Sequence, residues 1–178
     1  MKIVFALSVL ALLLLFVIFA ASRDRVDRST VPALDLQRYM GTWYEIARYD
    51  HSFEQWQTDV TAQYTLNADG RIEVENRGVD IRDGKIHTAH GKARPGRQPG
   101  QLRVSFFWIF YSDYNVLELG EDYSWALVGS SSARYLWILS RTPELPAATL
   151  DHILRLAEKR GYDTTRLLFT GKSAHKTS

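Results

Sequence analysis

The chain has 178 residues, of which 22 are Lys or Arg and 20 are Asp or Glu, so its formal net charge is +2. This length suits a single domain with a substantial core, and the balanced charge gives no field that would favour nucleic acid as a partner. The absence of cysteine excludes disulfides, thiolate metal sites, thiol nucleophiles and lipid attachment through cysteine within this sequence. Aromatic residues make up 12% and include five Trp, which indicates a lined cavity or an aromatic surface.

The sequence begins with an almost unbroken apolar run from Ile3 to Ala21 that ends in small residues. This pattern is typical of an export signal, but its length lies between that of a cleaved signal and that of a membrane-spanning helix. We therefore expect residues 1–22 to be a signal peptide or a membrane anchor, and the protein to be exported to the periplasm or cell envelope. Residues 23–32 begin with alternating Arg and Asp and are predicted to be a solvated linker.

After Pro32 the sequence predicts about eight short strands separated by turn residues. An Asp-Gly turn at residues 67–70 joins the second strand to the third, so these two should be antiparallel. Short strands with alternating polarity favour an antiparallel barrel or sandwich over a parallel sheet. The predicted strands are residues 43–50, 59–66, 71–76, 86–93, 101–107, 113–119, 123–129 and 134–141.

One helix is predicted between Pro146 and Gly161, because proline suits a first helical turn and glycine can end a helix. Its apolar stripe should cover the outer face of the sheet. The stripe consists of Leu150, Ile153, Leu154 and Ala157. A short final strand at residues 166–169 and a polar tail at residues 172–178 complete the chain.

Three separated motifs resemble the signature of the lipocalin family, and they occur in the order expected for it. The stretch "GTWYEIARYDHSFE" begins the first strand, "YNV" lies in a later strand, and "YLWILSRTPEL" closes the last one. With "VSFF", they are most similar to the bacterial lipocalins related to apolipoprotein D. The resemblance implies an all-β fold: residues 33–171 would form an eight-stranded antiparallel up-and-down barrel with a C-terminal α-helix packed on the outside, after an N-terminal signal or anchor helix.

Gly41, Trp43 and Arg141 are expected to be structural residues. A barrel of about eight strands is wide enough for one small ligand, so one end must be closed if the cavity is to be blind. Trp43 can form this closure, and Gly41 permits a tight bend of the backbone beneath it. The resemblance implies that Arg141 stacks on Trp43, a cation–π contact worth about 0.5–2 kcal/mol.

Strand alternation sends every second side chain into the barrel, and the family pattern suggests which set that is. Alternatively, these side chains could fill a core, as they can in small barrels, but Ala62 leaves room and Asn76 supplies a hydrogen-bonding group. An apolar and aromatic lumen of this kind suits a long hydrocarbon chain with a polar head group. The predicted ligand-binding residues are Val60, Ala62, Tyr64, Val74, Asn76, Val104, Phe106, Tyr114, Val116, Tyr135, Trp137 and Leu139.

A cluster of apolar, mostly aromatic residues is expected in the loops at the open end of the barrel. Such a cluster can contact a membrane interface or fold over the mouth as a lid, and both interpretations remain open. The cluster comprises Trp56, Trp108, Ile109, Phe110 and Tyr111. Four basic residues are expected to form a solvated face towards the other end: Lys92, Arg94, Arg97 and Arg103.

The sequence contains no nucleophile elbow, zinc-protease motif or glycine-rich phosphate loop. His87 and His90 are three apart on a predicted strand, so they point to opposite faces and cannot chelate one metal together. Glu45 shares a face with Trp43 and is interpreted as a buried carboxylate paired with a basic or phenolic neighbour. We therefore expect no catalytic residue, no metal site and no cofactor.

These patterns predict an exported protein that binds a fatty acid, a lysophospholipid or a similar amphiphile and serves in envelope lipid storage or transport. Many bacterial relatives carry a cysteine for lipid attachment at the end of the signal; this sequence has none, so cysteine lipidation is not expected. The expected membrane contacts are residues 3–21 and the mouth loops, and a homodimer is left open. Two alternatives remain, a lipid-modifying enzyme that uses the same lumen and a protein-interaction module with a filled barrel.

Overall fold

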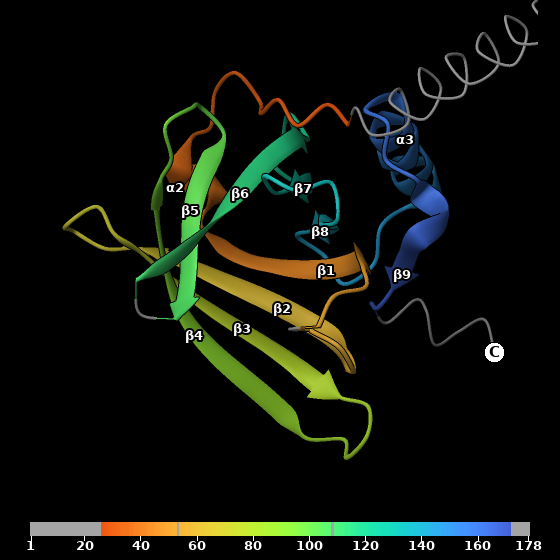
Figure 1. Ribbon diagram of the computed structural model, residues 1–178, viewed down its shortest axis with the longest axis horizontal. Helices are drawn as coiled ribbons and strands as arrows, with labels where there is room; N and C mark the ends of the chain where they lie inside the picture. Colours follow the sequence, from red (N-terminus) through yellow and green to blue (C-terminus); the bar gives the residue numbers. More distant parts are fainter. Residues whose placement is uncertain (1–25, 53, 108, 172–178) are drawn as a thin grey trace, which may run out of the picture.

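The computed structural model describes residues 26–52, 54–107 and 109–171, and within them one antiparallel sheet closes into a barrel (Figure 1). The sheet order is β2-β3-β4-β5-β6-β7-β8-β1-β9, and the additional pairing of β1 with β2 closes the ring. This arrangement confirms the predicted up-and-down barrel of eight strands, with β9 added beside β1. The strands are β1 (Gly41–Tyr49), β2 (Gln57–Leu66), β3 (Ile72–Asp80), β4 (Ile86–Pro95), β5 (Gln101–Phe107), β6 (Phe110–Leu119), β7 (Trp125–Gly129), β8 (Leu136–Ser140) and β9 (Leu167–Phe169).

Two strands, β3 and β6, extend furthest beyond their predicted bounds. β3 continues through Gly78 to Asp80 because the whole of it pairs with β4, from Ile72 opposite Ala93 to Val79 opposite Ile86. β6 begins at Phe110, which pairs with Phe107 of β5. The predicted loop at residues 108–112 is therefore mostly strand.

A short helix that the sequence did not predict lies at the closed end of the barrel. Helix α2 (Leu36–Tyr39) is capped by Asp35, whose carboxylate accepts hydrogen bonds from two backbone amides of its first turn. Four residues are too few to show a helical period, so this helix had no readable pattern. It places the fully buried Tyr39 next to Trp43, whose indole nitrogen donates to the Tyr39 carbonyl over 2.9 Å.

Arg141 closes the barrel from outside, as the resemblance implied. Its guanidinium carbon lies 3.8 Å from the centre of the Trp43 ring, and its nitrogens donate to the carbonyl oxygens of Arg38 (2.7 Å) and Thr42 (3.0 Å). Gly41 has a φ angle of +94°, and a Cβ at this position would lie 3.4 Å from an Arg141 nitrogen. The positive φ angle therefore favours glycine at this position, whereas a Cβ would meet Arg141 only at an ordinary contact distance.

Helix α3 (Ala147–Lys159) covers the outside of the sheet, as predicted (Figure 1). Ile153 and Ala157 are fully buried against a cluster that includes Leu117 and Ile138, residues that point outwards from β6 and β8. The protein thus has two cores, one inside the barrel around Trp43 and one between the barrel and α3. A 3-10 helix at Thr164–Arg166 connects α3 to β9.

The described chain begins along the closed end and is not a free linker there. The backbone amide of Asp27 donates to the Arg160 carbonyl over 2.8 Å, and that of Val31 donates to the Val116 carbonyl over 2.9 Å. Predictions for residues 1–22, Trp108 and residues 172–178 lie outside the described residues. Within the described part of the chain, no helix has the length and apolar character needed to cross a bilayer.

Replacing Trp43 by Ala should destabilise the protein by about 3–5 kcal/mol, because it removes a fully buried indole and the surface on which Arg141 stacks. Denaturant unfolding measures this loss. Trp56→Ala is the matched control, because Trp56 is 47% exposed and its removal should change stability by less than about 1 kcal/mol. Equal destabilisation by the two substitutions would contradict the assignment of Trp43 as the closure.

Candidate ligand-binding cavity

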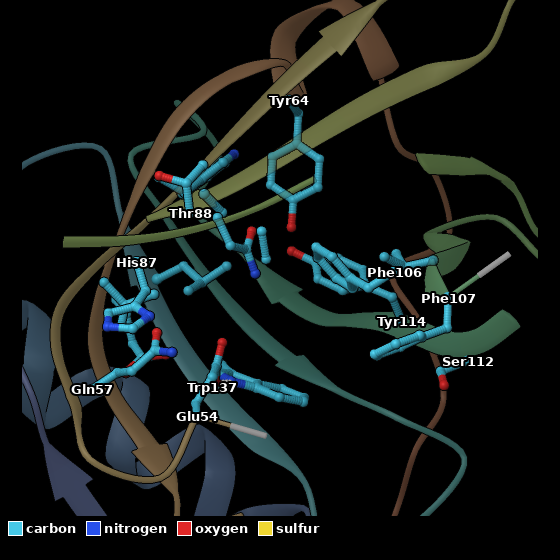
Figure 2. Close-up of a pocket in the computed structure, with 18 of the residues that line it drawn as sticks. Glu54, Gln57, Tyr64, His87, Thr88, Phe106, Phe107, Ser112, Tyr114 and Trp137 are labelled. Atoms are coloured by element: carbon cyan, nitrogen blue, oxygen red, sulfur yellow. Dashed lines mark hydrogen bonds between the residues drawn. The ribbon is translucent and has the colours of Figure 1, made fainter. Parts of the chain in front are cut away.

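A cavity of about 590 Å³ runs inside the barrel from Trp43 to the open rim (Figure 2). This volume lies within the range of about 300–1,000 Å³ that is usual for small-molecule sites. Its wall comes from β1–β6, β8 and the loop between β1 and β2. The barrel is therefore not filled by its own side chains, which argues against the filled-barrel alternative.

Most of the residues predicted to bind ligand do line this cavity: Val60, Ala62, Tyr64, Asn76, Val104, Phe106, Tyr114, Trp137 and Leu139. Val74 and Val116 do not, because both are buried in the packed cluster around Tyr39 and Trp43. Tyr135 also lies outside the lining and stacks on Trp137, with ring planes 7° apart and centroids 5.9 Å apart. Alternation gave the inward face of each strand correctly, but it could not tell the packed level of the barrel from the open level.

Small residues form the middle of the inward face of β4, beyond His87, and they set the width of the cavity at this level. Ala89 lines the wall, and a Cβ added to Gly91 would lie only 2.8 Å from two atoms of the Phe106 ring. Phe106 on β5 therefore packs across the bare backbone of Gly91. A larger residue at position 91 would push this ring into the cavity.

Three tyrosine hydroxyl groups meet in the deep part of the cavity. The Tyr39 and Tyr114 oxygens are 2.6 Å apart, and the Tyr64 hydroxyl hydrogen-bonds with that of Tyr114, towards which it points in Figure 2. Burial raises the pKa of Tyr64 to about 12 and also raises the pKa values of Tyr39 and Tyr114 well above the usual range. The group therefore stays protonated and uncharged near neutral pH, as a polar spot in an otherwise apolar and aromatic region.

Two carboxylates, Glu45 and Glu54, line the cavity on the side of β1. Arg48 donates to the Glu45 carboxylate over 2.5 Å, and Thr170 donates to the same oxygen over 2.6 Å. This confirms that Glu45 is paired with a basic neighbour. Residues three apart on a regular strand would face opposite ways, but a bulge between Glu45 and Ala47 brings Glu45 and Arg48 to the same side.

Glu54 was missed by the sequence analysis because it lies between β1 and β2, where alternation gives no direction. Its carboxylate accepts a hydrogen bond from the Trp137 indole nitrogen over 3.2 Å and lies 3.0 Å from a ring nitrogen of His51. The backbone carbonyl of Glu54 accepts from Arg48 over 2.7 Å. The loop that carries Glu54 is thus fixed to the barrel wall by two contacts, one with Trp137 of β8 and one with Arg48 of β1. The sequence analysis also missed Gln57, His87, Thr88, Ala89, Phe107, Ser112 and Asp113 as lining residues.

The environment of Glu45 disfavours its charged form. Burial raises the pKa of Glu45 to about 7, and the negative charge of Glu54 acts in the same direction. Arg48 and Thr170 oppose this shift because both stabilise the carboxylate, but they do not cancel it. Near neutral pH the Glu45 carboxyl group in the cavity wall can therefore gain or lose its proton.

The tip of the β5–β6 hairpin is the most apolar part of the rim. Phe107, Ile109 and Phe110 are 79%, 67% and 75% exposed, and we call these three residues the rim tip. Trp56, in the neighbouring β1–β2 loop, is 47% exposed. Four large side chains are thus presented to solvent around one opening.

Tyr111 does not belong to the rim tip, contrary to the prediction, because it lies on the outer face of β6. The guanidinium carbon of Arg94 lies 4.7 Å and the ammonium nitrogen of Lys92 5.8 Å from the centre of its ring, and Arg103 donates to its carbonyl. Arg94 and Arg103 pair with each other close to the β4–β5 turn, so their place towards the closed end agrees with the prediction, and the solvated face stays a prediction. Only Arg97, in the turn after β4, lies away from this group.

The tip of the β3–β4 hairpin brings one oxygen or nitrogen atom each of Asp80, Asp83 and His87 within 4.8 Å of one another. Arg82 donates to both oxygens of the Asp80 carboxylate, with a shortest distance of 2.6 Å, and its hydrogen bonds lower the pKa of that carboxyl group. Because Arg82 already holds this carboxylate, we describe the cluster as an ion-paired turn.

The barrel, its closure and its cavity are matched by known proteins. A family model described as a lipocalin-like domain matches residues 34–172. The chain belongs to the lipocalin family. Within it, the similarity to Blc proteins confirms the predicted bacterial subgroup.

The relatives of this lipocalin include the outer membrane lipoprotein Blc of Vibrio cholerae, 45% identical over 142 residues that cover 78% of this chain and 83% of the relative. The outer membrane lipoprotein Blc of Escherichia coli K12 is 40% identical over 158 residues, or 86% of this chain and 89% of the relative. Among solved structures, the cockroach allergen Per a 4 shares the fold with a TM-score of 0.68 at 21% identity, over 87% of this chain and 99% of that chain.

Glu45 should make the free energy of unfolding depend on pH. Its folded-state pKa of about 7 lies above the ordinary value of 4.5, so its contribution to stability is fully present below about 4.5 and is lost as the pH rises through about 7. Denaturant unfolding at a series of pH values should show the wild type losing stability relative to Glu45→Gln across this window. Parallel curves for the two proteins would show that Glu45 does not titrate in this way.

Proposed function

We propose that this lipocalin binds a single amphiphile with a long hydrocarbon chain, such as a fatty acid or a lysophospholipid, and carries it within the cell envelope. The observation that supports this most is the open 590 Å³ cavity with its largely apolar and aromatic wall. Burying about a dozen methylenes yields on the order of 10 kcal/mol at about 0.8 kcal/mol each. Association costs of at least about 4 kcal/mol reduce this towards micromolar affinity, which permits both loading and release.

An envelope location is supported by the apolar run at residues 3–21 and by the relatives named as outer membrane lipoproteins. The 178 residues contain no cysteine to which a lipid could be attached. We therefore infer that residues 1–22 deliver this lipocalin to the envelope without cysteine lipidation.

Carriage is favoured over catalysis by the way the polar groups of the cavity are engaged. The three tyrosines hydrogen-bond with one another, and Glu45 and Glu54 are held by Arg48 and Trp137. A general base needs a free acceptor aimed at a substrate proton, but the tyrosines stay protonated near neutral pH and Glu45 already accepts from Arg48 and Thr170.

We infer that the rim tip docks on a lipid bilayer. Exposed Phe and Ile side chains suit the membrane interface, and the basic residues Lys92 and Arg94 lie on the adjacent outer face around Tyr111, where they can meet anionic head groups. Docking would bring the mouth of the cavity to the surface from which a lipid must leave.

Trp137→Ala should weaken ligand binding more than it weakens the fold, because Trp137 lines the cavity. Titration with the fluorescent apolar probe N-phenyl-1-naphthylamine should show a loss of at least about tenfold in affinity. Trp125→Ala is the matched control, because Trp125 packs against His152 outside the barrel; it should lower stability and leave probe affinity unchanged. Equal probe affinities for the wild type, Trp137→Ala and Trp125→Ala would contradict the proposed binding site.

Replacing Phe107 and Ile109 together by Ser should reduce co-sedimentation with anionic lipid vesicles by at least about tenfold, since each inserted side chain contributes about 1.5–3 kcal/mol. Leu168→Ser, an exposed apolar residue of β9, is the control and should bind vesicles like the wild type. The rim tip could instead be covered by a second copy of the chain, and light scattering tests this alternative. If the wild type is a dimer and the double substitution makes it a monomer, the rim tip is a dimer interface and not a membrane-docking surface.

A further inference from the structure

The charged groups that line the cavity are all of one sign. Among the described lining residues there are three carboxylates, those of Glu45, Glu54 and Asp113, and there is no Lys or Arg. Asp113 is paired with Arg103, which lies 3.2 Å away on the outer face of the barrel. Glu45 is likewise paired with Arg48, so Glu54 carries the carboxylate charge that a bound molecule meets on the β1 side.

The nearest cation to these carboxylates is Arg48, and it is engaged elsewhere. One of its terminal nitrogens holds Glu45, and the other donates to the carbonyls of Glu54 (2.7 Å) and Gln57 (3.1 Å). Arg48 does not line the cavity. The carboxylate of a free fatty acid would thus find no available cation on the described wall and would instead meet negative charge.

Aromatic rings lie beside the Glu54 carboxylate. The Trp137 indole donates to it, and the two side chains lie next to each other on the cavity wall in Figure 2. Tyr135 stacks on Trp137, and the His51 ring centre lies 5.3 Å from that of Trp137. The Glu54 carboxylate thus lies at the N–H edge of the indole, and a carboxylate beside an aromatic wall is a combination that can recognise an alkylammonium group.

A separate observation also points to a hydrogen-bond donor in the ligand. The side-chain oxygen of Asn76 is buried, lines the cavity and has no hydrogen-bond partner within the described part of the chain. A buried acceptor without a partner is destabilising unless a bound molecule donates to it. A primary alkylammonium group could supply this donor, whereas a quaternary ammonium group could not.

We propose that Glu45, Glu54 and Trp137 form a subsite for an alkylammonium group, so that this lipocalin selects an ammonium-bearing amphiphile over a free fatty acid. The inference rests on the proposed carrier function and narrows its ligand class. Two kinds of molecule share this chemistry, cationic alkylamines and zwitterionic phospholipids with one chain. Both present an ammonium group at the end of a hydrocarbon long enough to enter the barrel.

The charge of this subsite changes near neutral pH. Burial and the charge of Glu54 raise the pKa of Glu45 to about 7, against the opposing effects of Arg48 and Thr170. A quaternary ammonium ligand keeps its charge at every pH, so its affinity should increase as the pH rises through about 7. His51 faces Glu54 and His87 faces the cavity, and Glu45→Gln isolates the share of the pH dependence that belongs to Glu45.

The test compares four probes with the same decyl chain: decyltrimethylammonium, decylphosphocholine, decanol and decanoate. Each is titrated into the full-length protein loaded with N-phenyl-1-naphthylamine. We expect decyltrimethylammonium to bind at least tenfold more tightly than decanoate, with decanol between them. Decylphosphocholine distinguishes zwitterionic lipids from cationic amines as ligands. If it binds more tightly than decanol, the subsite accepts zwitterionic lipids as well. If it binds more weakly than decanol, the subsite is specific for cationic amines.

Glu54→Gln tests the subsite directly, because glutamine can still accept the Trp137 hydrogen bond but carries no charge. It should reduce the preference for decyltrimethylammonium over decanol about tenfold. Glu75→Gln is the matched control, since Glu75 pairs with His90 on the outer face, and it should leave the preference unchanged.

If the wild type binds decanoate as tightly as decyltrimethylammonium, the inference is overturned, regardless of the results for the variants. If neither the dye nor any decyl probe binds, the carrier function itself fails, so the two failures are distinguishable.

Discussion

The stacking of Arg141 on Trp43 is the contact on which the rest of the molecule depends. The guanidinium covers one face of the indole and also donates to backbone carbonyls of α2 and β1. It therefore ties the segment that crosses beneath the barrel to the strand that begins there. The inner face of the same indole is part of the cavity wall. Trp43 therefore belongs both to the packed closure of the barrel and to the wall of the cavity. A substitution at Trp43 would affect stability and the ligand site together.

The sequence predicted the barrel, its closure and the direction of most side chains, because each of these follows from a local rule. Period-two alternation fixes which face a residue occupies, but Val74 and Val116 show that it does not fix depth along the barrel. Glu45 and Arg48 lie on the same face of β1 only because of a bulge, and a bulge cannot be recognised from the pattern of polar and apolar residues. Glu54 lies in a loop and is positioned by long-range contacts with Trp137 and Arg48. Such contacts become visible only when the strands are assembled.

The polar side of the cavity is not explained by stability. Burying an ion pair such as Glu45 and Arg48 gains little over well-packed apolar residues, because desolvation offsets the attraction. Placing a second carboxylate nearby is less favourable still, as the raised pKa of Glu45 reflects. A barrel selected for packing alone would not keep these groups. Their retention beside an open cavity is understandable if they act on what enters it.

The described chain starts at Val26, next to α3 and along the same end of the barrel as α2, while the rim lies at the opposite end (Figure 1). Backbone hydrogen bonds from Asp27 and Val31 fix this exit point to the body of the protein. If residues 1–22 anchor the protein, attachment at this end of the barrel would keep the floor towards the anchoring bilayer and turn the opening away from it. A molecule held in this way would exchange cargo with the facing compartment or an apposed membrane, and would have to be released to draw lipid from the leaflet that holds it.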